Sequence, residues 1–131
     1  MSLLGATEIR ELAAKLDLNP SKGLGQNFVI DGNVCQRIVR QVSIAPSDVA
    51  LEIGPGLGSL TLAILETSAP LIAVEIDSRL AKQLPETVKS HNPNADLTVV
   101  NQDALNVTQL PKDPTVLVAN LPYNVSVPVL L

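Results

Sequence analysis

The sequence predicts an α/β fold built on one parallel sheet, and two patterns support this prediction. Short apolar runs, typical of buried parallel strands, alternate along the chain with helical or connecting segments. The first of these runs ends in a glycine turn that leads directly into a helix. Strands joined in this way form right-handed strand–helix–strand units and a single sheet. A chain of 131 residues is expected to fold as one domain.

The N-terminal part of the chain has a helical rather than a strand pattern. Apolar positions spaced at i, i+3, i+4 and i+7 predict a helix that Thr7 caps and that ends before Asn19. Residues 1–20 are therefore set apart as an N-terminal helix, of which residues 1–5 are expected to be partly an expression remnant. A second helix is predicted after Asp31, which caps it. Its buried face is expected to contain Val34, Cys35, Ile38, Val39 and Val42.

The remainder of the chain is predicted to form four strands, over residues 49–53, 71–76, 97–100 and 116–119. A helix over 59–66 joins the first two, and a helical segment that begins at Asp77 and that Pro85 interrupts or restarts joins the next two. His91 falls in a turn and is expected to be a solvated loop residue. After the fourth strand the pattern predicts the first turns of a helix up to Leu131. We therefore expect a fragment truncated after the fourth parallel strand, with the outer edge of that strand unpaired.

The glycine turn Gly54-Pro55-Gly56-Leu57-Gly58 is the strongest local signal for a ligand site. Its glycines can take positive φ and let a ligand approach the main chain without a Cβ in the way. Turns of this kind bind NAD, FAD, nucleotides or S-adenosylmethionine, and some are purely structural. The turn alone therefore predicts a site but leaves its ligand open.

The second and third strands are also followed by polar groups, at the edge where doubly wound sheets bind ligands. Glu75, about twenty residues after the first glycine of the turn, can accept both hydroxyls of a ribose. Asp103 can accept the amino group of an adenine, or it can simply cap a helix that starts at Ala104. The two carboxylates fit NAD as well as they fit S-adenosylmethionine.

The segment Asn120-Leu121-Pro122-Tyr123 after the fourth strand discriminates better. An aromatic amine is a poor nucleophile because its lone pair is delocalised. The Asn120 side-chain oxygen and the Leu121 carbonyl can accept its hydrogens and favour a pyramidal nitrogen, while Tyr123 stacks on the base. Pro122 fixes the backbone, and no metal or ionised general base is required. The alternative is a plain turn, since Asn and Pro are turn residues.

Composition limits the chemistry and the partners. One cysteine and one histidine exclude a disulfide framework and argue against a metal site, and Cys35 is expected to be a small buried hydrophobe. The net charge of −4 is unlike that of a nucleic-acid-binding surface, although the first forty residues carry five basic and four acidic side chains. Without a signal peptide or an apolar run of about 20 residues, a cytoplasmic chain with no membrane contact is expected.

Taken together, five motifs resemble those of the ribosomal RNA adenine dimethyltransferase family of the KsgA type. In order, they are Gly25-Gln26-Asn27-Phe28, Glu52-Ile53-Gly54-Pro55-Gly56-Leu57-Gly58, Glu75-Ile76-Asp77, Gln102-Asp103-Ala104 and Asn120-Leu121-Pro122-Tyr123-Asn124. The resemblance implies a Rossmann-like, S-adenosylmethionine-dependent methyltransferase fold. Residues 21–131 would be its N-terminal part, without the later strands and a C-terminal helical domain.

The same resemblance implies a reaction, a cofactor and site residues. The family places two methyls from S-adenosyl-L-methionine on each of two adjacent adenosines near the 3′ end of small-subunit rRNA, during maturation of the pre-ribosomal small subunit. No metal is implied, and a monomer is expected at full length. Phe28 is expected near the target pocket, and Val29 stands where the family more often has leucine. The implied cofactor-binding residues are Gln26, Asn27, Val29, Gly54, Gly56, Glu75, Ile76, Asp103, Ala104 and Asn120, and the implied catalytic residues are Asn120, Leu121, Pro122 and Tyr123.

Three other functions share part of this pattern. A related antibiotic-resistance family methylates an adenosine of large-subunit rRNA, but it typically has isoleucine where this chain has Leu121. A non-catalytic homologue that acts in ribosome assembly or transcription would not need Asn120 and Tyr123. An NAD-dependent oxidoreductase would show the spacing G-x-G-x-x-G, which the turn lacks. The leading interpretation is the small-subunit enzyme, with the fragment alone expected to be inactive.

Overall fold

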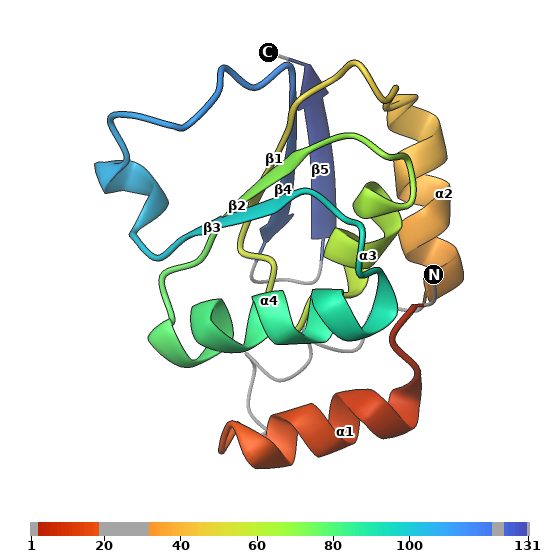
Figure 1. The fold of residues 1–131 in the computed structure, drawn as a ribbon, viewed down its shortest axis with the longest axis vertical. Helices are drawn as coiled ribbons and strands as arrows, with labels where there is room; N and C mark the ends of the chain where they lie inside the picture. The colour runs from red at the N-terminus through yellow and green to blue at the C-terminus, as the bar shows by residue number, and fades with distance from the viewer. Residues whose placement is uncertain (1–2, 19–31, 122–124, 131) are drawn as a thin grey trace.

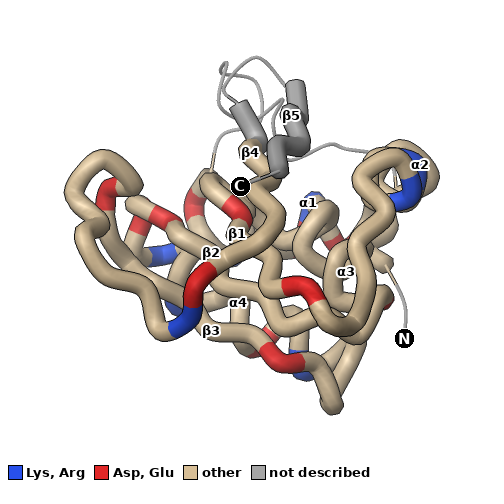
Figure 2. Tube along the Cα trace, turned by 90° about the horizontal axis from the view of Figure 1, so that it is seen from above, with Lys and Arg blue, Asp and Glu red and all other residues tan. Residues whose placement is uncertain are grey.

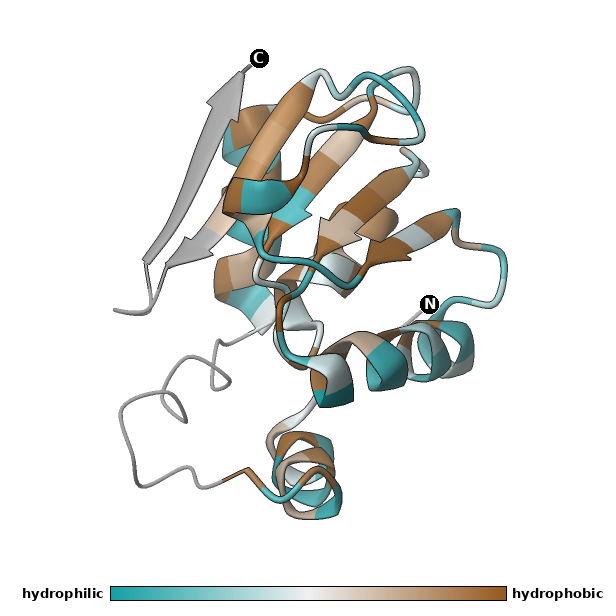
Figure 3. Ribbon diagram, turned by 90° about the vertical axis from the view of Figure 1, so that its left-hand side faces the viewer, coloured by the Kyte–Doolittle hydropathy of each residue, from teal (hydrophilic) through white to brown (hydrophobic). Residues whose placement is uncertain are grey.

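The centre of the molecule is a twisted sheet whose first four strands run parallel. The computed structural model describes residues 3–18, 32–121 and 125–130, with backbone alone from residue 120 onward (Figure 1). The sheet has five strands in the order β3-β2-β1-β4-β5. The parallel ones are β1 (Ala50–Ile53), β2 (Leu71–Val74), β3 (Leu97–Val100) and β4 (Val116–Leu121). They are among the most apolar segments of the chain (Figure 3), and they confirm the predicted α/β class.

The segment after β4 is a strand and not a helix. β5 (Val125–Leu130) pairs antiparallel with β4, from Leu121 opposite Val125 to Val116 opposite Leu130. The predicted helix and the predicted unpaired edge of β4 are therefore both wrong. The physical reason is twofold: three β-branched valines alternate with other residues in this segment, and the open edge of β4 offers backbone groups with which they can pair. Pro128 is tolerated because β5 lies at the edge of the sheet that the described residues form.

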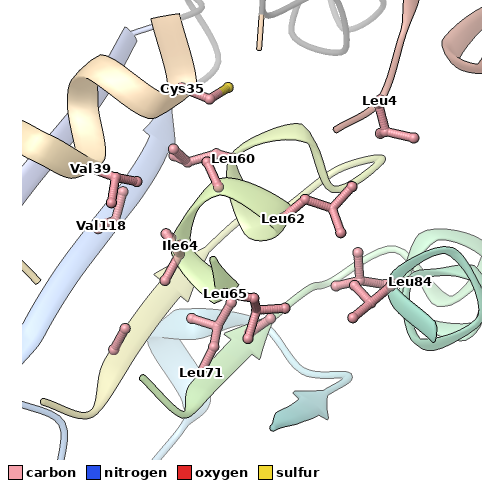
Figure 4. Packing of buried hydrophobic residues seen from close by; sticks show 14 of the residues in the cluster. Leu4, Cys35, Val39, Leu60, Leu62, Ile64, Leu65, Leu71, Leu84 and Val118 are labelled. Atoms are coloured by element: carbon pink, nitrogen blue, oxygen red, sulfur yellow. The ribbon is translucent and has the colours of Figure 1, made fainter. Parts of the chain in front are cut away.

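Helix α3 (Ser59–Leu65) is the core of the molecule, because all of its residues are buried. It connects β1 to β2, and side chains from α2 (Gly32–Val42), α4 (Ser78–His91), β2 and β4 gather around it (Figure 4). A helix that is apolar all round is stable only in such a fully enclosed position. The core is aliphatic, since the chain has one Phe, one Tyr and no Trp; its largest members include Leu60, Leu62, Ile64, Leu71 and Leu84.

Helix α2 buries a narrower stripe than predicted. Cys35 is fully buried and Val39 nearly so, as expected, but Val34 is 41% exposed. The buried stripe is centred on this i, i+4 pair, and Val34 lies about 100° away from Cys35 around the helix, at the edge of the stripe. The predicted burial of Val34 is therefore wrong, and Asp31, the predicted cap, lies outside the described residues.

Helix α1 (Ala6–Lys15) lies beside α4, below it in Figure 1. The predicted cap is wrong: the chain is extended at Gly5, which is the N-cap residue, so that Thr7 already belongs to the first turn. α1 and α4 run antiparallel, because Glu8 contacts His91 whereas Lys15 contacts Glu86. α4 also continues without a break through Pro85, so the predicted interruption there is wrong. None of the helices in the described ranges has the length and apolar character needed to cross a bilayer.

His91 is not the solvated loop residue that the sequence predicted. It is the last residue of α4, its side chain is only 12% exposed, and its Nε2 lies 2.8 Å from Oε1 of Glu8. α1 covers this end of α4 and removes the imidazole from water. The local sequence around His91 holds no sign of this contact, because Glu8 is 83 residues away.

Candidate functional site

The carboxyl ends of the four parallel strands lie level with one another. The register pairs Ile53 with Val74 on one side and with Ala119 on the other, and it pairs Val74 with Val100. The next residue of each of the four strands therefore follows a position at the same level of the sheet. They are Gly54, Glu75, Asn101 and Asn120. Strand order reverses beside β1, since β2 follows on one side and β4 on the other, and ligands bind at such a switch point.

The glycine turn after β1 uses the conformational freedom of its glycines. Gly54, Gly56 and Gly58 have φ values of 71°, 59° and 106°, all in the left-handed range that side chains disfavour. The Gly58 N–H donates to the Pro55 carbonyl at 3.1 Å and closes the turn just before α3 begins. The turn therefore presents main chain rather than side chains at the edge of the sheet, beside the end of β2.

Glu75 joins the end of β2 to this turn. Its Oε1 accepts a hydrogen bond from the Gly56 N–H at 3.1 Å, and its Oε2 accepts one from the Asp77 N–H at 3.0 Å. Burial raises the pKa of Glu75, and these backbone donors oppose the shift by stabilising the carboxylate. Each carboxylate oxygen has two acceptor sites, so both oxygens keep capacity for further donors such as hydroxyl groups.

Asn101, which the sequence analysis missed, holds the turn after β2 in place. Its side-chain amide donates to the carbonyls of Glu75 at 2.9 Å and Ile76 at 3.3 Å, and its oxygen accepts from the Ser78 hydroxyl at 3.1 Å. The turn after β2 is thus held from the strand beside it. Position is the one signal that the sequence offers, because Asn101 directly follows the third predicted strand.

Asp103 caps a short helix, which is the structural alternative that the sequence left open. Its Oδ1 accepts from the Leu105 N–H at 2.9 Å and caps η2 (Ala104–Asn106), a single turn of 3₁₀ helix. Capping uses one carboxylate oxygen and leaves acceptor capacity on the other.

Two large apolar side chains are exposed after neighbouring strands, Ile76 at 66% and Leu105 at 92%. Ile76 was named from the sequence, whereas Leu105 was not.

Glu52 lies in β1, two residues before the glycine turn, and is completely buried. The Thr61 hydroxyl donates to its Oε1 at 2.5 Å, and its Oε2 has no hydrogen-bond partner among the residues that the structure describes. Burial is the main cause that raises the pKa of Glu52 to about 8, and the nearby Glu75 adds to it. Burial therefore favours the protonated form of Glu52 at neutral pH. The sequence analysis quoted this residue within a motif without giving it a role.

Part of the predicted site cannot be compared with the structure. Gln26, Asn27, Phe28 and Val29, like Pro122 and Tyr123, lie outside the described residues. Asn120 and Leu121 belong to β4 itself rather than to a turn after it, and they pair with Ser126 and Val125. Their roles, and those of Gly54, Gly56, Glu75, Ile76, Asp103 and Ala104, remain predictions. Within the described ranges, no three His, Cys, Asp or Glu residues are grouped so that they could hold a metal.

Comparison with protein families gives one clear match. Residues 18–131 match the model of the ribosomal RNA adenine dimethylase family. A curated relative from Leifsonia xyli subsp. xyli, a ribosomal RNA small subunit methyltransferase A, is 59% identical over 133 aligned positions. The alignment covers 100% of this chain and 48% of the relative, so the chain spans about half the length of the curated relatives that it matches.

Solved structures of related proteins share the fold. A dimethyladenosine transferase from Plasmodium falciparum superimposes with a TM-score of 0.60 and 29% identity, over 70% of this chain and 32% of the other. The 23S rRNA methyltransferase ErmE superimposes with a TM-score of 0.55 and 27% identity, over 72% of this chain and 48% of the other. The predicted methyltransferase fold is thereby confirmed.

Proposed function

Because this chain belongs to the ribosomal RNA adenine dimethylase family, we propose that it is the cofactor-binding part of an S-adenosylmethionine-dependent rRNA adenine dimethyltransferase. The proposed reaction places two methyls on each of two adjacent adenosines near the 3′ end of small-subunit rRNA, as a step in maturation of that subunit. The observation that carries this proposal is the level row of strand ends. Because of this alignment, the Glu75 carboxylate contacts the glycine turn, and Asn120 follows the aligned position Ala119 of β4.

The described residues fit the cofactor in three respects. Glu75 has acceptor capacity for the two ribose hydroxyls, and it is held from Gly56 on one side and from Asp77 on the other. Asp103 would accept the adenine amino group, with Ile76 and Ala104 beside the ring. Gly54 and Gly56 would lie under the methionine part, where a side chain would be in the way. Gln26, Asn27 and Val29 are assigned to the methionine end by resemblance.

The cofactor supplies a sulfonium methyl, and the task of the protein is to aim an adenine amine at it. Asn120 and Leu121 would accept hydrogen bonds from the two amine hydrogens and favour a pyramidal nitrogen, so that its lone pair is less delocalised into the ring. Pro122 would fix this backbone and Tyr123 would stack on the base, which positions the amine for an in-line attack. Each transfer would form one nitrogen–carbon bond and break one sulfur–methyl bond, with S-adenosylhomocysteine as the leaving group and one proton released to solvent. No step needs a metal.

The proposed partner is the rRNA of the pre-ribosomal small subunit, met in the cytoplasm by a monomeric full-length protein. Helix α2 supports an RNA-facing role, since Arg37 and Arg40 are both exposed there and the helix has no acidic residue (Figure 2). Acidic side chains lie mainly elsewhere in the described chain. The remainder of the RNA-binding surface would belong to parts of the protein that this chain does not include.

We expect Glu75→Ala to weaken binding of S-adenosylhomocysteine, the product form of the cofactor, by about 1–3 kcal/mol, or roughly 5- to 150-fold. The loss follows from removing the acceptor of both ribose hydroxyls. Isothermal titration of the natural-length protein measures it, with the unfolding temperature recorded in parallel. Glu86→Ala, which removes an exposed carboxylate from α4, is the matched control and should leave the affinity unchanged. Equal affinity of Glu75→Ala and wild type would contradict the cofactor assignment.

The substrate is tested separately. Natural-length protein is incubated with the cofactor and unmodified small or large ribosomal subunits, and dimethyladenosine is measured by mass spectrometry of the nucleosides. Product in small-subunit rRNA is expected. Product confined to large-subunit rRNA would favour the alternative large-subunit reaction; ErmE, a 23S rRNA methyltransferase, is a structural neighbour of this chain. Cofactor binding without product on either subunit would favour a binding role.

A further inference from the structure

Arg79, in the first turn of α4, joins two segments that are far apart in the sequence. Its Nη1 donates to the carbonyl of Leu16 at 2.9 Å and to that of Asp17 at 3.4 Å. Its Nη2 donates to Oδ2 of Asp77 at 3.0 Å, and its Nε donates to Oδ1 of the same carboxylate at 3.4 Å. One guanidinium therefore binds both the end of α1 and the turn after β2.

The α1 side of this bridge is a built helix end. Asp17 has φ 57°, the left-handed conformation of a helix C-terminal turn, and the Leu18 N–H donates back to the Ala13 carbonyl at 2.8 Å. This turn directs the carbonyls of Leu16 and Asp17 toward Arg79. The two carbonyls are among the acceptors that a helix C-terminus leaves without partners inside the helix.

The other side of the bridge leads to the candidate cofactor site. Asp77 caps α4 by accepting from the Arg79 N–H at 2.8 Å, and its own N–H donates to Oε2 of Glu75. The other oxygen of Glu75 accepts from Gly56. Hydrogen bonds thus run without interruption from the end of α1 through Arg79, Asp77 and Glu75 to the glycine turn.

We propose that Arg79 is a positioning residue for the cofactor site. By bracing the end of α1 against the turn after β2, it holds the Glu75 carboxylate in the orientation that meets the ribose. This inference rests on the proposed function, because it takes Glu75 as the ribose acceptor. It makes α1 a part of the support of that site rather than a helix packed on the outside.

Arginine suits this position better than lysine. The planar guanidinium presents donors in several fixed directions, so it can bind a carboxylate with one edge and two carbonyls with the other. A lysine ammonium keeps the charge but is a single point at the end of a flexible chain. Arg79→Lys should therefore behave more like Arg79→Met than like wild type.

The test compares S-adenosylhomocysteine with its 2′-deoxy analogue in isothermal titrations of the natural-length protein. Arg79→Met is expected to weaken binding of the ribose form by roughly two- to fivefold, and that of the deoxy form much less, because the analogue lacks a hydroxyl that Glu75 binds. The affinity ratio of the two ligands should therefore fall. A purely structural loss would weaken both ligands alike, so an unchanged ratio in Arg79→Met would overturn the proposal.

Lys15→Met is the matched control. It removes one positive charge and another contact between α1 and α4, with Glu86 at 3.9 Å, but it does not touch the turn after β2. An equal fall of the ratio in Lys15→Met would also overturn the role of Arg79. Glu75→Ala separates the two proposals. If Glu75→Ala keeps the wild-type ratio of affinities for the ribose and deoxy ligands, the ribose assignment fails. If this ratio falls in Glu75→Ala but not in Arg79→Met, only the role of Arg79 fails.

Discussion

Raising the pH from 5 to 9 is expected to lower the free energy of unfolding by up to about 4 kcal/mol through Glu52 alone. Burial raises the pKa of this carboxyl from 4.5 to about 8. Between these two values the folded chain binds a proton that the unfolded chain has lost, so stability falls as the pH rises. The loss is complete once the pH exceeds the folded pKa. The raised pKa of Glu75 acts in the same direction. The lowered pKa values of Asp48 and Asp77 act in the opposite direction, because the stability that they contribute is lost as the pH falls below about 4.

Glu52→Gln isolates this effect. A glutamine has nearly the shape of the protonated acid and can still accept from Thr61, so urea unfolding of the variant should depend much less on pH than that of wild type. At pH 9 the variant is expected to be the more stable protein. Glu86→Gln, on the exposed face of α4, should keep the wild-type loss of stability. Parallel stability curves for wild type and Glu52→Gln would show that Glu52 is charged in the folded protein.

Gly58→Ala is expected to destabilise the fold by about 2–4 kcal/mol. Two causes add: residue 58 has φ 106°, which a Cβ disfavours, and the new Cβ would lie 2.8 Å from Cδ1 of Leu84. Leu84 is only 1% exposed and is enclosed by the core, so its side chain has little room to move. Urea unfolding at neutral pH measures the loss. Gly5→Ala is the control, since Gly5 has φ −91° and no atom lies within 4 Å of the added methyl.

A double-mutant cycle separates the two causes. Leu84→Ala alone should cost about 2–5 kcal/mol by leaving a cavity. In that background Gly58→Ala should cost only the backbone strain of about 1–2 kcal/mol, because the clashing methyl is gone. An equal cost of Gly58→Ala in both backgrounds would mean that Leu84 does not restrict the turn.

The features that the sequence predicted correctly are those that local patterns encode. Each parallel strand was visible as a short apolar run, and the position of Glu75 followed from its place at the end of one of them. Two of the wrong predictions depend on what a segment contacts in the fold. Residues 125–130 pair with the open edge of the preceding strand, β4, instead of forming a helix. His91 is covered by Glu8, which is 83 residues away in the sequence.

The candidate site was predictable to a similar degree. Strand ends in a parallel sheet meet at one edge, so the polar residues after them could be grouped in advance. Asn101 and Arg79 were missed because both act by hydrogen bonding to backbone or to another side chain, and such support depends on exact spacing in three dimensions. The raised pKa of Glu52 depends on complete burial, which cannot be inferred from an acidic residue in a short predicted strand.

The position of α1 also determines when this helix can form during synthesis. Its partners come late in the chain, since Leu16 and Arg79 are 63 residues apart and Glu8 and His91 are 83 residues apart. An isolated helix of 10 residues is barely stable in water, and closing so long a loop is entropically unfavourable. On a nascent chain, α1 therefore stays largely unstructured until α4 has been made. Although α1 precedes α4 by more than sixty residues in the sequence, it cannot dock until α4 has been translated.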